Sequence, residues 1–168
     1  MPLPIAHGLV GAGLVKLIHP NVSPKDWKSL LIGFVVANLA DFDFVFVFLF
    51  GWKNFHRGIT HSLAFAILVS LIFFILLRNK DWRIPLAYSA AFLSHTILDF
   101  IFAKYGGGVR LFIPFDDNSY RLGILSFSEL TRGFHILDMF YFSIIEILIF
   151  FPIFLLVITL KTRFSQNI

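Results

Sequence analysis

Long runs of apolar residues separated by short polar segments dominate the chain. A helix that crosses a bilayer needs about 20 mostly apolar residues. Four runs approach or reach that length: Ser29 to Phe50, Ser62 to Leu77, Ile84 to Ala103 and Ile136 to Leu160. A fifth run, Ile5 to Ile18, would span only about 21 Å as a helix. It predicts a half-helix or a helix lying in the membrane interface.

The runs do not alternate between apolar and polar residues, so a membrane β-barrel fits them poorly. The pattern predicts an all-α fold, a polytopic membrane bundle of four spanning helices plus the short N-terminal helix. We expect it to form a single domain over residues 1–168. The connection from Lys104 to Phe134 contains three consecutive glycines and a polar turn. It predicts a mobile loop outside the hydrocarbon region.

Composition supports the membrane interpretation. The chain is 58% apolar and 14% charged, with 23 phenylalanines, whereas soluble domains are about half apolar and a quarter charged. Its 14 basic residues lie in short clusters beside the apolar runs, which is typical of membrane-flanking charge and not of a nucleic-acid groove. Eight of them on one side against six on the other place the C-terminus in the cytoplasm. The chain has no cysteine, which excludes thiolate metal ligands, and we expect no removable signal peptide.

Ionisable residues interrupt the apolar runs, where each costs about 2.5–3.5 kcal/mol on insertion scales. They are Asp41, Asp43, His95, Asp99, Asp138 and Glu146. Because the runs alternate in direction, most of these groups reach one side of the membrane, the non-cytoplasmic side. The histidines near the ends of the runs reach the same side: His7, His56, His61 and His135. This convergence predicts a shared polar site. Glu146 lies deeper, and for it we expect a structural role between helices.

The spacing of these residues refines the site. His95 and Asp99 are four apart, so they share one face of a helix and can reach a common centre. Asp41 and Asp43 are about 200° apart around a helix, so either the helix breaks there or only one of the two is a ligand.

The five-residue spacing of His56 and His61 suits a loop that runs into a helix. Gly58 lies between the two histidines, and Thr60 is a candidate N-cap for that helix. On a shared helical face, His135 and Asp138 are further candidates for the site.

Imidazole and carboxylate ligands without thiolate suit Zn²⁺, Mn²⁺ or Fe²⁺. Two other interpretations use the same residue types. Each polar side chain could bond to a neighbouring helix, or the set could form a proton or ion pathway.

The segment from His56 to Ser62 reads HRGITHS and resembles the HRGxTHS signature of the YdjM-like inner-membrane metal-dependent hydrolases, often described as LexA-binding hydrolases. The early His7, the pair Asp41 and Asp43, and the helix segment from His95 to Asp99 fit the same resemblance, which covers about residues 5–140. The order of ligands is also similar to that of zinc-dependent phospholipases C and single-strand nucleases.

The resemblance implies that one or two divalent ions, zinc or alternatively manganese, bind a set of six residues: His7, Asp41, His56, His61, His95 and Asp99. It also implies phosphoester hydrolysis. We expect Arg57 to stabilise phosphoryl charge and Asp43 to act as general base. The substrate would be a phosphoester such as a phospholipid headgroup, and the 104–134 loop could gate access. The alternative is a non-catalytic membrane protein, either an ion-translocating bundle or an interaction partner in a stress response.

Overall fold

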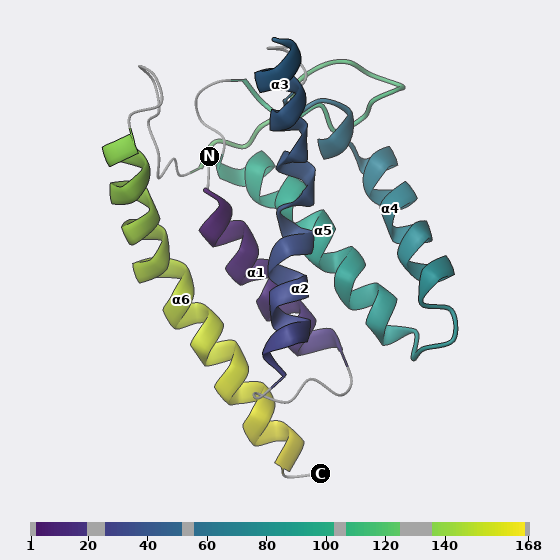
Figure 1. Cartoon of the computed structure of the whole chain (residues 1–168), viewed down its shortest axis with the longest axis vertical. Helices are drawn as coiled ribbons and strands as arrows, with labels where there is room; N and C mark the ends of the chain where they lie inside the picture. The colour runs from purple at the N-terminus through teal and green to yellow at the C-terminus, as the bar shows by residue number, and fades with distance from the viewer. Residues whose placement is uncertain (1–2, 20–25, 52–55, 103–106, 125–135, 167–168) are drawn as a thin grey trace.

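The computed structural model describes residues 3–19, 26–51, 56–102, 107–124 and 136–166 (Figure 1). Among these residues the regular structure is helical apart from one isolated bridge between Val109 and Tyr120. The helices are α1 (Pro4–Ile18), α2 (Trp27–Ala37), η1 (Leu39–Asp43), α3 (Phe44–Phe50), η2 (Ile59–His61), α4 (Leu63–Leu76), α5 (Arg83–Phe102) and α6 (Ile136–Gln166), η1 and η2 being 3₁₀ helices. The predicted all-α class is confirmed.

The described helices do not establish the four spans that the sequence predicted, when they are judged by their length and composition. In the described part of the chain, α5 and the segment Phe140–Arg163 of α6 are long and apolar enough to cross a membrane. A third span results if α2 and the segment Leu39–Phe50 are counted together, although they are bent by 49°. Helices α1 and α4 are apolar but shorter. The expected count of four spans is therefore not confirmed.

The bend lies close to Asp41 and Asp43. For these residues the sequence allowed either a break in the helix or a single ligand. Helix α2 ends at Ala37, and the next residues continue as the tighter η1 before α3 begins at Phe44. Asn38 stands at the junction, and its side-chain amide donates to the carbonyl of Phe34 at 2.9 Å. A change of helix type alters the angle between successive side chains. The helix therefore does break at the two aspartates.

Helix α1 occupies the centre of the bundle, between α6 on one side and α2 and α5 on the other (Figure 1). Small residues let α1 and α2 approach closely. A Cβ added to Gly11 would lie 2.4 Å from the Cβ of Ala37 and 2.7 Å from the carbonyl oxygen of Gly33. The backbones of α1 and α2 can meet this closely only because residue 11 has no side chain.

The start of α4 differs from the expectation in one respect. Ser62 is the N-cap, and its side-chain oxygen accepts from the backbone N–H of Phe65 at 3.1 Å. The prediction that Thr60 caps this helix is wrong. The hydroxyl of Thr60 instead donates to Asp43 at 2.8 Å.

The segment 107–124 follows α5 and lies at the same end of the bundle as α3 and η2 (Figure 1). Backbone hydrogen bonds attach it to its neighbours. The N–H of Arg110 donates to the carbonyl of Arg57 at 3.1 Å, and the N–H of Leu63 donates to the carbonyl of Leu111 at 2.9 Å. This part of the predicted loop is therefore held against the turn that carries His56.

Candidate metal centre

Every residue of the predicted metal set lies at one end of the bundle, and five separate elements supply them. The first turn of α1 supplies His7, η1 supplies Asp41, the turn before η2 supplies His56, η2 supplies His61, and the second half of α5 supplies His95 and Asp99. We call these six residues the His/Asp cluster. Asp138 is exposed on α6 and is not part of it, and His135 lies outside the described residues.

Three ligand atoms in the centre of the cluster form a small triangle. The Nε2 atoms of His61 and His95 are 3.1 Å apart, and Oδ1 of Asp41 lies 3.5 Å from the first and 3.3 Å from the second. Ligands in a tetrahedral zinc site with bonds of about 2.0–2.1 Å are separated by about 3.4 Å. The triangle therefore has the size of one face of such a site. Oδ2 of Asp99 lies 3.8 Å from Nε2 of His61, so Asp99 is a candidate for the fourth ligand of such a site.

Hydrogen bonds on the far side of His95 determine which nitrogen faces the triangle. Nδ1 of His95 lies 2.8 Å from the carbonyl oxygen of Ala37, which can only accept, so Nδ1 carries the hydrogen. Nε2 then presents a lone pair toward the facing Nε2 of His61. Such an outer hydrogen bond is the usual way that proteins orient a histidine ligand. Because two nitrogens at this distance need a proton or a cation between them, the arrangement favours binding of a positive charge.

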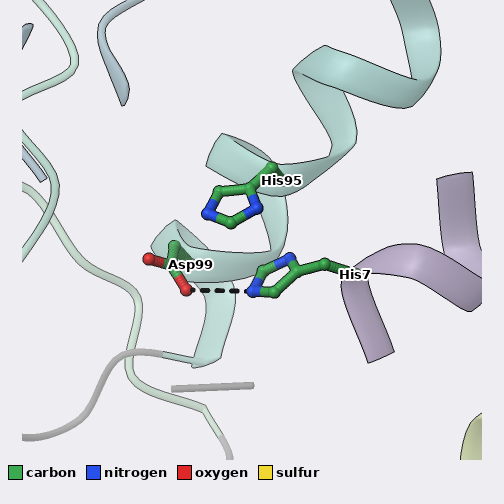
Figure 2. A group of neighbouring side chains, drawn as sticks. All are labelled: His7, His95 and Asp99. Atoms are coloured by element: carbon green, nitrogen blue, oxygen red, sulfur yellow. Dashed lines mark ion pairs between the residues drawn. The ribbon is translucent and has the colours of Figure 1, made fainter. Parts of the chain in front are cut away.

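A second group lies beside the triangle and contains His7, His95 and Asp99 (Figure 2). The ring of His7 stacks on that of His95 with 3.8 Å between centroids, and Nε2 of His7 lies 3.5 Å from Oδ1 of Asp99. All three side chains are fully buried. Among the described residues neither nitrogen of His7 has a hydrogen-bond partner, and the Asp99 carboxylate has ion-pair contacts to His7 and Arg57 without hydrogen-bond geometry. Buried polar atoms in native proteins rarely lack partners, so one nitrogen of His7 and the Asp99 carboxylate fit a bound cation.

Asp43 has a different environment from Asp41, although both aspartates reach the site. Oδ1 of Asp43 accepts from Nδ1 of His56 at 2.9 Å. Oδ2 accepts from the hydroxyl of Thr60 at 2.8 Å and from the backbone N–H of Arg57 at 3.2 Å. These bonds orient His56 so that its Nε2 faces away from Asp43. That nitrogen is buried and has no hydrogen-bond partner among the described residues.

Arg57 occupies a tight turn between two site histidines. Its φ of 60° lies in the left-handed region, which costs a non-glycine residue about 1 kcal/mol or more. Its Nε lies 3.2 Å from Oδ2 of Asp99, and its terminal nitrogen donates to the carbonyl of Gly107 at 3.0 Å. The side chain thus joins the turn, α5 and the 107–124 segment. Strained backbone of this kind is often found at functional sites.

Among the described residues, the carboxylates around the cluster outnumber the arginine that faces them when the imidazoles are neutral. The carboxylates of Asp41, Asp43 and Asp99 contribute −3, and the guanidinium of Arg57 contributes +1, which leaves −2 if the imidazoles are neutral. Uncompensated buried charge is strongly unfavourable. One divalent ion would neutralise it.

The same three carboxylates change the pKa of His61. Burial disfavours its imidazolium, but hydrogen bonds to Asp41 and Asp43 and the charge of Asp99 outweigh burial and raise the pKa of His61 to about 9. The site therefore attracts positive charge, as a proton or as a metal ion.

Three contributors to this geometry were not recognised from the sequence. They are the hydroxyl of Thr60 and the carbonyl oxygens of Ala37 and Gly107. Thr60 could have been found because it lies one residue before His61. Any residue can supply a carbonyl, so the other two leave no signal in the sequence.

Comparison with known proteins agrees with the membrane fold. The profile of the family described as "YdjM inner membrane protein" matches residues 1–167. Inner membrane protein YbcI of Escherichia coli (strain K12) is 34% identical over 133 residues, which cover 71% of this chain and 72% of the relative. No solved structure matches the chain. The chain therefore belongs to the YdjM inner membrane protein family.

Proposed function

We propose that the protein is a metal-dependent hydrolase of the inner membrane that cleaves phosphoesters, with zinc as the first choice of ion and manganese as the second. The observation that carries the proposal is the triangle of Asp41 Oδ1, His61 Nε2 and His95 Nε2, whose sides measure 3.1–3.5 Å. A divalent ion bound there would lower the pKa of a coordinated water and polarise a phosphoryl oxygen. His7 and Asp99 would complete the site or hold a second ion.

Asp43 and His56 would have different roles in the reaction. Asp43 was expected to act as general base, and this role stays a prediction. Because its oxygens already accept three hydrogen bonds, we propose that Asp43 acts through His56. It would hold the Nδ1–H of His56, which leaves the Nε2 lone pair of His56 available as a further ligand or as the base.

Arg57 supplies the positive charge that a phosphoryl group needs. Its guanidinium is held by Asp99 and by the carbonyl of Gly107, at the boundary between the cluster and the 107–124 segment. A guanidinium in a fixed orientation can stabilise developing negative charge on phosphoryl oxygens.

A phospholipid headgroup is the substrate class that the surroundings favour. Asp41 and His56 are the cluster residues with partly exposed side chains, at 13% and 16%. The ring of Phe44 stacks on His56 with 3.9 Å between centroids, and Phe42, next to Asp41, is 64% exposed. An amphiphile could therefore bring its phosphate to Asp41 and His56 while its apolar part contacts these phenylalanines and the lipid. We propose that this end faces the non-cytoplasmic side.

The test combines metal analysis with an activity assay on one detergent-purified sample. We expect one or two zinc or manganese ions per chain and the release of a soluble product from phospholipid or a generic phosphodiester. Protein that carries no metal and shows no thermal shift with either ion would contradict the metal site. Protein with full metal content and no turnover of any phosphoester would favour the non-catalytic alternative.

A further inference from the structure

Glu146 is a buried carboxylate in the apolar part of α6, far from the His/Asp cluster in the sequence. Its residue is 1% exposed, whereas only 11% of the span around it is buried. A carboxylate within a spanning helix is costly, by up to about 2.5–3.5 kcal/mol at the helix centre on insertion scales. A specific partner is needed to offset that cost.

The partner is the first turn of α1. Oε1 of Glu146 accepts from the backbone N–H of Leu3, and Oε2 accepts from that of Ala6 at 3.0 Å. Leu3 is the N-cap of α1, and no side-chain hydrogen bond from the cap residue satisfies this turn. The N–H groups at a helix start have no partner within the helix, and negative charge there is favourable. Glu146 therefore caps α1 from another helix.

This cap lies next to a member of the cluster. Ala6 immediately precedes His7, so the hydrogen bond to Glu146 restrains the backbone at the point where His7 begins. His7 must be placed accurately, because its ring stacks on His95 and its Nε2 lies 3.5 Å from Asp99. A small rotation or shift of α1 would move Nε2 away from Asp99.

We propose that Glu146 is a positioning residue for His7, and through His7 for the metal ion that His7 helps to bind. The inference rests on the metal site of the proposed function, but the position of His7 itself does not require a metal. Two measurements separate these parts: Zn²⁺ affinity, and the chemical accessibility of His7 in metal-free protein.

The first measurement is Zn²⁺ titration of metal-stripped protein in detergent. We expect Glu146→Ala and His7→Ala each to weaken zinc binding, by about 10- to 100-fold for the outer residue Glu146. Glu146→Gln should give a smaller loss, because its amide oxygen still accepts one of the two N–H groups. Asp138→Asn removes an exposed carboxylate from the same helix and should bind zinc like the wild type.

The double variant His7→Ala/Glu146→Ala shows whether Glu146 acts through His7. We expect it to bind zinc no more weakly than His7→Ala alone, because residues that act through one contact are not additive. Additive losses, or wild-type zinc affinity in Glu146→Ala, would overturn the proposal. If Glu146→Ala does not fold, the same comparison with Glu146→Gln decides.

The second measurement is modification of histidines by diethyl pyrocarbonate, read by mass spectrometry on metal-free protein. His7 is fully buried, so it should be protected in the wild type and modified faster in Glu146→Ala. Equal protection in both would overturn the positioning role. Faster modification in protein that never binds zinc would support the positioning role and count against the metal site only.

Discussion

The histidines of the site differ in which atom holds them. His95 donates from Nδ1 to the carbonyl of Ala37, and His56 donates from Nδ1 to Asp43. Nδ1 of His61 lies 3.0 Å from the hydroxyl of Thr60. In each of these three rings Nδ1 is engaged, so that Nε2 remains available. This arrangement is the one expected of metal ligands.

The triangle gives the most direct test at the residue scale. We expect His61→Ala and His95→Ala to weaken Zn²⁺ binding by more than the about 10- to 100-fold typical of outer residues, because each removes a ligand. His19→Ala, a histidine at the other end of α1, is the matched control and should keep wild-type affinity. Isothermal titration of the detergent-solubilised variants measures this. Equal affinities for all three variants would rule out the triangle as the site.

Arg57 separates catalysis from metal binding. Arg57→Ala should keep its zinc but lower phosphodiester turnover by about 100-fold or more, as the loss of other charge-stabilising donors does. Arg57→Lys keeps the charge without the guanidinium fork and should recover only part of the rate. Arg110→Ala removes the arginine that pairs with Asp117 on the neighbouring segment, so it serves as control. Wild-type turnover in Arg57→Ala would refute the proposed role.

The raised pKa of His61 gives a pH dependence. Below a pKa of about 9, metal-free His61 carries a proton that zinc must displace. Zinc affinity should therefore rise with pH from 6 toward 9, and about one proton should be released per ion near pH 7. Titrations in buffers of different ionisation enthalpy measure that proton. A zinc affinity that stays constant between pH 6 and pH 9 would show that zinc displaces no proton from His61.

At the scale of elements, helix breaks and close contacts arrange the cluster. η1 allows both Asp41 and Asp43 to reach the site, one toward His95 and the other toward His56. The contact between α1 and α2 places the carbonyl of Ala37 where His95 needs it, since Gly11 lies against Ala37. The site thus depends on backbone positions as well as on its own side chains.

Two glycines of α1 test this dependence. Gly11→Ala would force α1 away from Ala37 and Gly33, and we expect a loss of about 1–3 kcal/mol in the free energy of unfolding together with weaker zinc binding. Gly13→Ala is the control, because its Cβ would meet Phe154 at an ordinary 3.7 Å. It should be neutral or stabilising by about 0.5–1 kcal/mol. Denaturant unfolding in detergent compares them, and equal stability of both variants would contradict the close contact.

The sequence predicted the helices to within a few residues, because long apolar runs leave little choice of structure. It also brought His7, His61, His95 and Asp99 to one end, because alternating helices place their ends alternately. It could not decide how Asp41 and Asp43 divide their roles, since that depends on the local change to a 3₁₀ helix. The cap on α4 was assigned to Thr60 rather than Ser62, because Ser and Thr are both favoured N-cap residues and stand two positions apart here.

At the scale of the whole molecule, we expect the end that carries the His/Asp cluster to face the non-cytoplasmic side. The segment 107–124 and the turn between α4 and α5 lie at opposite ends of the bundle (Figure 1). Asn118 and Asn79 are exposed there, and the chain contains no cysteine, so single cysteines can be introduced at each. We expect Asn118→Cys to react with an impermeant thiol reagent in intact cells, and Asn79→Cys to react only after lysis. Labelling of both from one side would contradict the proposed arrangement.

The hydrogen bonds from Leu3 and Ala6 to Glu146 also fix an order of events during biosynthesis. They join residues 143 and 140 positions apart, so the ribosome must make almost the whole chain before the first helix receives its cap. A nascent chain that has inserted only as far as α5 already contains every member of the His/Asp cluster, but α1 still lacks the partner that restrains His7. Full assembly of the site would therefore coincide with insertion of the last helix. A chain truncated before α6 should retain the triangle residues without a fixed His7.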